Sequence, residues 1–178
     1  MEKIIIDESQ FVRTISRISH EIIEKHQNLD DLIVVGIKRR GAEIAELIQR
    51  KIADLTNKVL PSIDLDITFY RDDLEYAEPT QSPIYHGASD FISIQNKTVI
   101  LVDDVLFTGR TIRAALDALV DFGRAARVEL VIFVDRGHRE LPIRADYVGK
   151  NVPTSRQEKI QVRTMKFDGC YEVALLSK

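Results

Sequence analysis

The stretch that decides the fold lies between residues 99 and 111, where the chain reads Val99-Ile100-Leu101-Val102-Asp103-Asp104-Val105-Leu106-Phe107-Thr108-Gly109-Arg110-Thr111. Its first four residues are apolar and mostly β-branched, which is typical of a buried strand in a parallel sheet. Two adjacent carboxylates stand at the carboxyl end of this strand, and a Thr-Gly-Arg-Thr loop leads from there into a helix. The spacing predicts a strand, a ligand-binding loop and a helix in direct succession.

The loop from Thr108 to Thr111 has the chemistry of a phosphate site. Backbone N–H groups in the loop and in the first turn of the following helix can bind an anion, and the helix dipole adds positive charge there. Asp103 and Asp104 supply acceptors that suit two neighbouring ribose hydroxyls. The alternative is purely structural: two ordinary carboxylates at a strand end, followed by an ordinary turn.

Length and composition are those of one α/β domain. The chain has 178 residues, 44% of them hydrophobic and 30% charged, which suffices for a sizeable core. No apolar run approaches the roughly 20 residues that span a bilayer, and the start lacks the basic-then-apolar pattern of a secretion signal. We therefore expect a cytoplasmic protein without a membrane partner. One cysteine, Cys170, excludes an internal disulfide.

Positive charge is concentrated in the last third of the chain. The formal net charge is -3, yet the segment from Arg136 to Lys166 holds eight Lys or Arg against three acids, a local balance of +5. A basic patch on an acidic body fits a local contact with nucleic acid better than binding over the whole surface. We expect no DNA partner.

The other segments alternate between strand and helix patterns, as in a parallel sheet flanked by helices. Asp7 and Gln10 predict a capping box at the start of the first helix. The patterns predict helices at about 8–27, after residue 41 and after residue 111, and strands at 1–6, 31–37, 59–69, 128–134, 146–148, 159–162 and 171–176. The last three pieces are expected to complete the sheet.

Two further segments belong on the ligand side of such a sheet. Lys38-Arg39-Arg40-Gly41 stands between a buried strand and a helix start, where open α/β sheets bind ligands. A diphosphate would satisfy these cations, although a solvated turn is the alternative. From Tyr70 to Asn96 the periodicity disappears, so we expect a flexible arm or lid at about 70–96 that carries Arg71.

Three polar loops, including Asp135 to His138, are thus expected at one edge of the sheet. Together they suit transfer of a ribose 5-phosphate between diphosphate and a base, a reaction that needs no protein nucleophile. Asp103, Asp104 and Arg71 are the candidate catalytic residues. Mg²⁺ prefers substrate phosphates and a few carboxylates, so we expect Asp103 and Asp104 to hold it indirectly, through phosphoribosyl diphosphate (PRPP) or water. Departing diphosphate would be bound by Lys38, Arg39, Arg40 and Gly41.

The central stretch resembles the phosphoribosyl-diphosphate loop of the type I phosphoribosyltransferases. That resemblance implies an α/β fold in which residues 1–178 form a single domain with a central, mainly parallel sheet flanked by helices. It adds a flexible β-arm at about 70–96 and a small hood built from about 136–178 plus the N-terminal residues. PRPP and its phosphate would be bound by Val105, Leu106, Phe107, Thr108, Gly109, Arg110 and Thr111.

The residue before Thr-Gly bears on the identity of the base. In the 6-oxopurine enzymes of this superfamily a carboxylate typically occupies that position and handles a proton of the purine. Here the position is Phe107, which weighs against hypoxanthine and guanine and leaves uracil, orotate or adenine open.

A wider resemblance is to the family of pyrimidine-operon attenuation proteins that are also uracil phosphoribosyltransferases. It is carried by Val35-Gly36-Ile37-Lys38, by residues 66–74 and above all by the segment from Val134 to Ser155. It implies that uracil and PRPP give UMP and diphosphate, with Arg136 and the backbone near Ile160 over the base, in a homodimer or larger homo-oligomer. The family commonly has Lys-Thr-Arg-Gly in the diphosphate loop, whereas this chain has Arg39 in place of Thr.

The same resemblance implies regulation. Family members bind a stem-loop in the leader of their own pyrimidine-biosynthesis (pyr) mRNA, more tightly with UMP or UTP bound, and promote transcription termination. The matching RNA-binding candidates are Ser16, His20, Arg139, Arg144 and Lys150. Two alternatives stay open: a plain phosphoribosyltransferase whose basic segment is a subunit interface, and an RNA regulator that uses the pocket only as a UMP sensor.

Overall fold

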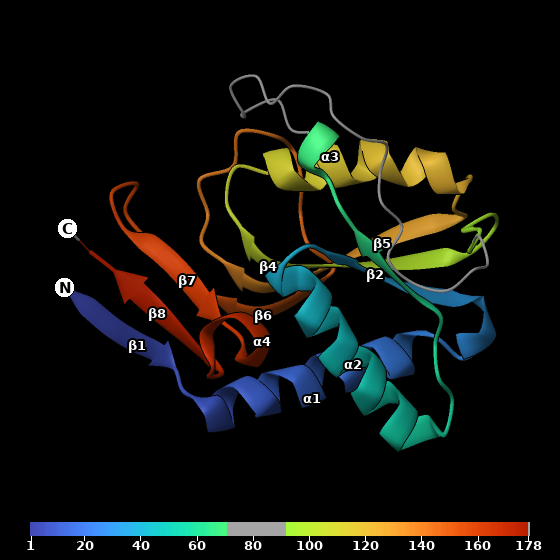
Figure 1. Ribbon diagram of the computed structural model, residues 1–178, viewed down its shortest axis with the longest axis horizontal. Coiled ribbons are helices and arrows are strands. Elements are labelled where there is room, and N and C mark those ends of the chain that lie inside the picture. Colours follow the sequence, from blue (N-terminus) through green and yellow to red (C-terminus); the bar gives the residue numbers. More distant parts are fainter. Residues whose placement is uncertain (71–91, 178) are drawn as a thin grey trace.

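A five-stranded sheet of order β3-β2-β4-β5-β6 forms the centre of the computed structural model, which describes residues 1–70 and 92–177 (Figure 1). All four neighbouring pairs run parallel, which confirms the predicted sheet. β2 is buried along its whole length, as expected of a parallel strand covered on both faces. The strands are β2 (Leu32–Ile37), β3 (Ser62–Leu65), β4 (Thr98–Leu106), β5 (Arg127–Asp135) and β6 (Tyr147–Asn151).

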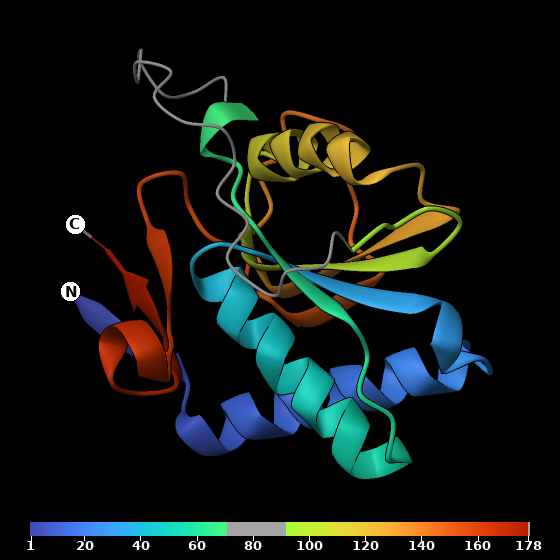
Figure 2. The same cartoon turned by 45° about the vertical axis from the view of Figure 1, so that its right-hand side comes forward.

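Helices cover both faces of this sheet. Helices α1 (Glu8–Lys25) and α2 (Arg40–Thr56) pack on one face, and α3 (Arg110–Leu119) packs on the other (Figures 1 and 2). The predicted capping box is present, since the Asp7 side chain accepts a hydrogen bond from Gln10 N and the Gln10 side chain accepts one from Asp7 N. Two apolar cores result, one on each face of the sheet.

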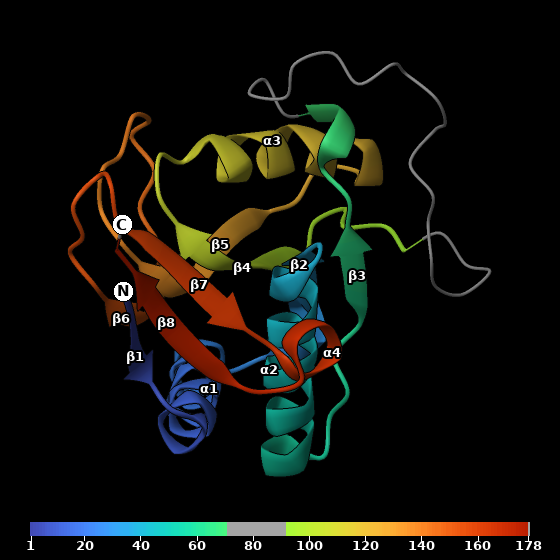
Figure 3. The same cartoon turned by 60° about the vertical axis from the view of Figure 1, so that its left-hand side comes forward.

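A second sheet of three strands stands beside the first (Figure 3). Its strands are β1 (Glu2–Ile6), β8 (Glu172–Leu176) and β7 (Lys159–Arg163), paired antiparallel in that order. The prediction that 159–162 and 171–176 complete the main sheet was wrong. Parallel neighbours need a crossover of about a dozen residues or more, whereas β7 and β8 are joined by residues 164–171, which contain the short helix α4 (Met165–Asp168). We use hood for this second sheet together with α4.

Strand β3 is shorter than the predicted 59–69. In the described sheet it pairs only with β2, from Ser62 to Leu65. Asp66 then redirects the chain, because its Oδ1 accepts hydrogen bonds from Thr68 N at 3.0 Å and from Thr68 Oγ1 at 2.6 Å. A 3₁₀ turn follows at Thr68–Tyr70. The alternation of apolar and polar residues therefore continues beyond Leu65, the last residue that pairs with β2.

The structure bears differently on the predicted arm at about 70–96 and on the question of a membrane-spanning helix. The greater part of the predicted arm, residues 71–91 including Arg71, lies outside the described residues. Across the part of the chain that the structure covers, every helix is too short or too polar to pass through a bilayer.

A buried carboxylate lies near the amino end of β5, far along the strand from Asp135. Glu129 is 1% exposed. Its Oε2 accepts a hydrogen bond from the Tyr147 hydroxyl at 2.7 Å and lies 2.9 Å from His26 Nε2, while Lys25 Nζ is 3.0 Å from Oε1. Burial by itself raises the pKa of Glu129, but the bonds from Tyr147, His26 and Lys25 outweigh burial and lower that pKa to about 2.

This cluster predicts a loss of stability in acid. A carboxylate whose pKa is lower in the folded state stabilises the fold above its unfolded pKa, and the stabilisation disappears as the pH falls toward the folded value. For Glu129 the window runs from about 4.5 down to about 2, and the free energy of unfolding should drop by an amount of order 3 kcal/mol across it. Urea unfolding at several pH values measures this. Glu129→Gln should flatten the dependence, whereas exposed Glu24→Gln should not; equal slopes for wild type and Glu129→Gln would contradict the assignment.

Candidate active site

Both candidate carboxylates lie within β4 instead of after it. The strand continues past them because it remains paired with β5 as far as Leu106 and Asp135. Asp103 is 5% exposed, and its Oδ1 accepts a hydrogen bond from Asp104 N at 2.9 Å. Asp104 Oδ1 accepts one from Val105 N at 2.8 Å. These bonds fix both side chains, and burial raises the pKa of Asp104 above its ordinary value.

A cavity of about 370 Å³ opens beside these carboxylates, within the size range of small-molecule sites. It brings the cationic turn and the carboxylates together, and it adds a segment around Asp66 that was not among the predicted site residues. The lining residues are Ile37, Lys38, Arg39, Asp66, Ile67, Thr68, Asp103, Asp104, Val105 and Thr111. Cations, carboxylates and the hydroxyl of a loop residue therefore line the same cavity.

The predicted phosphate loop is held in a fixed shape. Gly109 is the N-cap of α3 with φ of +94°, a left-handed conformation that favours glycine. Thr108 Oγ1 accepts a hydrogen bond from Arg110 N at 3.3 Å, and the Thr108 carbonyl accepts bonds from Glu140 N and Leu141 N at 2.9 and 3.1 Å. The loop thus precedes a helix amino terminus, where an anion is stabilised.

Of the three cations in the turn from Lys38 to Gly41, only two line the cavity. Lys38 and Arg39 line the cavity, and the peptide bond between them is cis. Arg40 begins α2 and instead directs its guanidinium at α4, where Nε and Nη2 donate to the two carboxylate oxygens of Asp168. Sequence reasoning missed Asp168 altogether.

Gly41 sits where no side chain fits. A Cβ on this residue would lie 2.8 Å from the Val102 carbonyl oxygen and 3.1 Å from Asp103 Cα. We predict that Gly41→Ala pushes the cationic turn away from β4 and lowers kcat/KM for PRPP by about tenfold, because a displacement near 1 Å is costly in a preorganised site. Steady-state kinetics measure this, with thermal melts as the control for folding. Unchanged kinetics would show that the close approach of turn and strand is unimportant.

The two predicted base contacts lie on different sheets, Arg136 directly after β5 and Ile160 in β7. The Arg136 guanidinium is 4.0 Å from the centre of the Phe107 ring, a stacking distance for a cation on an aromatic face. Arg136 donates to Thr154 Oγ1 and to the carbonyls of Ser155 and Glu158 at 2.7 to 3.1 Å. Burial lowers the pKa of Arg136. Ile160, in β7, is 5% exposed.

Four of the five RNA-binding candidates lie around the edge strand β6. Arg17 of α1 donates to the carbonyls of Val148 and Gly149 at 3.2 and 2.5 Å, so α1 lies against β6. Ser16 and His20 flank Arg17 on that helix, and His20 Nδ1 is 2.7 Å from the Ser16 carbonyl oxygen. Lys150 is exposed and belongs to β6, and Arg144 is exposed and precedes that strand by three residues. We refer to Ser16, His20, Arg144 and Lys150 together as the β6 surface.

Arg139, the fifth candidate, is half-buried and bonded to other groups of the protein. Its guanidinium donates to the carbonyls of Ile143, Phe107 and Gly137 at 3.0, 2.9 and 3.3 Å, and it also pairs with Asp135. Because Phe107 belongs to the phosphate loop, the bond from Arg139 to the Phe107 carbonyl helps to hold that loop in place. An RNA role for Arg139 stays a prediction.

Fold and site together define a phosphoribosyltransferase, since a parallel sheet places carboxylates, a phosphate loop and a cationic turn around one cavity. A family model described as phosphoribosyl transferase domain matches residues 3–167. Over its full length the chain is 87% identical to the "Bifunctional protein PyrR" of Actinobacillus succinogenes and 74% identical to that of Haemophilus influenzae, each covered completely. The chain belongs to the phosphoribosyltransferase family and, within it, to the bifunctional PyrR proteins.

Solved structures agree with this fold. A hypoxanthine phosphoribosyltransferase from Staphylococcus aureus superimposes with a TM-score of 0.71 at 20% identity, covering 99% of this chain and 92% of that one. The corresponding enzyme of Trypanosoma cruzi gives 0.70 at 18% identity, covering 98% of this chain and 96% of that one. Identities this low support the architecture alone.

Proposed function

We propose that the chain transfers ribose 5-phosphate from PRPP to uracil, giving UMP and diphosphate, and that with a uridine nucleotide bound it binds the leader of pyr mRNA and promotes transcription termination. The observation that carries the enzymatic part is the single cavity shared by Lys38, Arg39, Asp103, Asp104 and Thr111. The bifunctional PyrR relatives support the combination of the two activities.

The reaction breaks the bond between C1 of the ribose and diphosphate and forms a bond from C1 to a uracil nitrogen, which loses its proton. Positive charge grows on the ribose ring as diphosphate leaves. Asp103 and Asp104 hold the ribose hydroxyls and oppose that charge. Lys38 and Arg39 neutralise the departing diphosphate, and the loop from Val105 to Thr111 anchors the 5-phosphate. Each preorganised group of this kind contributes about 10²- to 10³-fold in rate.

Phosphoribosyltransferases generally use Mg²⁺ together with PRPP, and the donor set fits this ion. Asp103, Asp104 and Asp66 offer hard oxygen ligands. In residues 1–70 and 92–177 no three His, Cys, Asp or Glu side chains converge on a metal position, so Asp103 and Asp104 would hold Mg²⁺ through PRPP or water. When bound, the ion supplies positive charge to the diphosphate oxygens.

The base site lies between the carboxyl end of β5 and strand β7 of the hood. Arg136 ties the loop from Thr154 to Glu158 to the end of β5, and its Nη1 has no hydrogen-bond partner within the described residues. This donor and the backbone near Ile160 bind uracil carbonyl and N–H groups. The Phe107 ring lies against the Arg136 guanidinium and offers no carboxylate for a 6-oxopurine. This weighs against hypoxanthine and guanine and is compatible with uracil.

Regulation uses the β6 surface as the RNA-binding face. Basic Lys150 and Arg144 contact phosphates, and the polar groups of Ser16 and His20 contact a single-stranded loop, which is where proteins read RNA sequence. A homodimer or larger homo-oligomer would present this face more than once.

One pair of assays tests the proposal. Purified protein with uracil, PRPP and Mg²⁺ should form UMP, and the RNA transcribed from the DNA upstream of the coding region should bind more tightly when UMP is added. RNA binding without turnover would leave only the UMP sensor, and turnover without RNA binding would leave only the plain transferase. Failure of both assays would overturn the proposal.

A further inference from the structure

A bidentate ion pair connects the cationic turn to the hood. Arg40 Nε donates to Asp168 Oδ2 at 3.0 Å, and Arg40 Nη2 donates to Asp168 Oδ1 at 2.8 Å. Two parallel bonds between an arginine and a carboxylate fix orientation as well as distance. The two side chains are 31% and 15% exposed, so water screens the pair only in part. Arg40 is accordingly absent from the lining of the cavity that holds Asp103 and Asp104.

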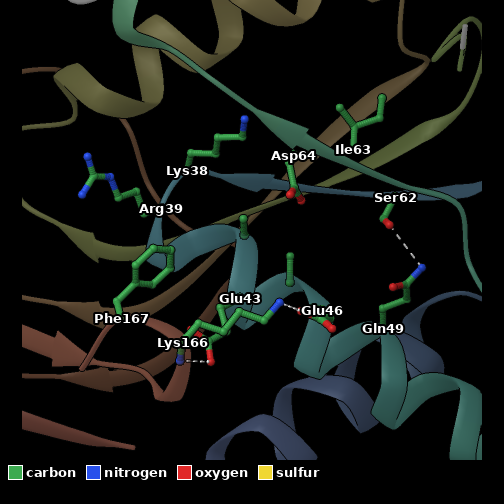
Figure 4. A pocket seen from close by; sticks show the side chains of 12 residues that line it. Lys38, Arg39, Glu43, Glu46, Gln49, Ser62, Ile63, Asp64, Lys166 and Phe167 are labelled. Atoms are coloured by element: carbon green, nitrogen blue, oxygen red, sulfur yellow. Dashed lines mark hydrogen bonds and ion pairs between the residues drawn. The ribbon is translucent and has the colours of Figure 1, made fainter. Parts of the chain in front are cut away.

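Further contacts join the same two helices. Glu43, one turn beyond Arg40 in α2, is 3% exposed and accepts hydrogen bonds from Lys166 N at 3.1 and 3.2 Å and from the Tyr171 hydroxyl at 3.1 Å. Glu46 pairs with the Lys166 ammonium group (Figure 4). Asp168 Oδ2 also accepts from Thr164 N at 3.0 Å, which closes the turn of α4 around the ion pair. The start of α2 and the helix α4 therefore form one unit.

The Arg40 charge also reaches the carboxylates of the cavity. The hydrogen bonds to Asp168 are the main cause that raises the pKa of Arg40, and the charge of Asp104 adds to it. Arg40 is therefore bonded to a carboxylate of the hood and also feels the charge of a carboxylate of the cavity. The residues immediately before it, Lys38 and Arg39, are the two cations that line the cavity.

We propose that Asp168 is a positioning residue for the diphosphate site: by holding the Arg40 guanidinium against the hood, it sets the turn that aims Lys38 and Arg39 at the diphosphate. This inference rests on the proposed transferase activity. Asp168 is not among the residues that line the cavity, and it acts through Arg40. Removal of its charge should weaken PRPP binding and leave uracil binding unchanged. Arg136 and the loop from Thr154 to Glu158 do not depend on the ion pair, and the backbone at Ile160 is held by its own pairing with β8.

Asp168→Asn is the test variant, since it keeps the shape of the side chain but removes its charge and one acceptor. We expect KM for PRPP to rise about tenfold and KM for uracil to stay within about twofold, because hydrogen bonds to charged groups carry an effect of this size. Glu2→Gln is the matched control. It removes a carboxylate from β1 of the same hood, where Glu2 is 46% exposed and pairs with Arg163 at 2.9 Å. It should leave both KM values within about twofold, since exposed ion pairs contribute little.

Two further variants, Arg40→Lys and Asp168→Glu, complete the experiment. Arg40→Lys preserves the charge but cannot make the two-bond contact, and it should reproduce the PRPP-specific rise if Asp168→Asn fails to fold. Asp168→Glu should recover most of the lost affinity. Equal rises in both KM values, or KM for PRPP within about twofold of wild type in the folded variants, would overturn the inference. If the wild type itself shows no turnover, the proposed activity fails, and calorimetry with PRPP still decides whether the ion pair affects its binding.

Discussion

Asp104→Asn is expected to lower kcat for UMP formation by about 10²- to 10³-fold, the range found when one preorganised electrostatic group is lost. The substitution keeps the shape and the hydrogen bond from Val105 N, but it removes the negative charge that we propose faces the ribose. An effect on charge that develops in the transition state appears in kcat more than in KM. Initial rates with saturating uracil and PRPP measure it.

The control for that experiment is Asp117→Asn. Asp117 lies on the exposed side of α3, where it pairs with Arg113 at 3.6 Å and is 54% exposed. It carries the same charge and lies outside the cavity lining. Its loss should leave kcat within about twofold, since exposed ion pairs contribute little. If Asp104→Asn kept kcat within about twofold of the wild type, its carboxylate would have no part in the reaction, and the site would be wrongly assigned.

The second large effect concerns RNA. We expect the double variant Arg144→Ala/Lys150→Ala to weaken binding of the pyr leader stem-loop by about a hundredfold, because each lost contact between a cation and a phosphate removes about tenfold. The slope of log K against log salt should also become shallower, by about 0.7 for each single-strand phosphate contact that disappears. Uracil turnover should be unchanged, since both side chains lie away from the cavity lining. Filter binding at several salt concentrations measures both effects.

Two further variants define the β6 surface. Lys58→Ala removes an exposed cation that pairs with Asp30 and precedes β3, at the opposite edge of the main sheet from β6, so it should bind RNA like the wild type. Arg139→Ala should instead impair turnover, because its guanidinium supports the Phe107 carbonyl. If the double variant lost turnover and kept RNA affinity, the β6 surface would be wrongly placed.

Local signals predicted the elements that depend on local chemistry. The buried strands β2 and β4 follow from continuous apolar runs, and α1 follows from helical spacing behind the Asp7 capping box. The sheet assignment of β7 and β8 could not be read in this way. Their short patterns suit either sheet, and the partner that decides, β1, lies at the other end of the chain.

The same division applies to the site. The carboxylates lie near the carboxyl end of β4, and the phosphate loop and the cationic turn follow β4 and β2. Their convergence at one edge of the parallel sheet was therefore predictable from the sequence. The roles of Arg40 and Arg139 were not, because their partners are chosen by tertiary packing: Arg40 and Asp168 are separated by 128 positions in the sequence. Charge in a motif indicates a site, whereas the direction of each side chain depends on neighbours that no spacing rule identifies.

The pairing of the chain's two ends has a consequence for synthesis. β1 is hydrogen-bonded to β8 from Glu2 opposite Leu176, and the Met1 amine donates to the Ser177 carbonyl at 2.6 Å. On the ribosome, β2 to β6 can pair as they emerge, but β1 must wait for β8. Until residues 172–176 have been made, β1 has no partner strand and the second sheet cannot form. The hood is therefore a late product of folding that is added to an existing main sheet.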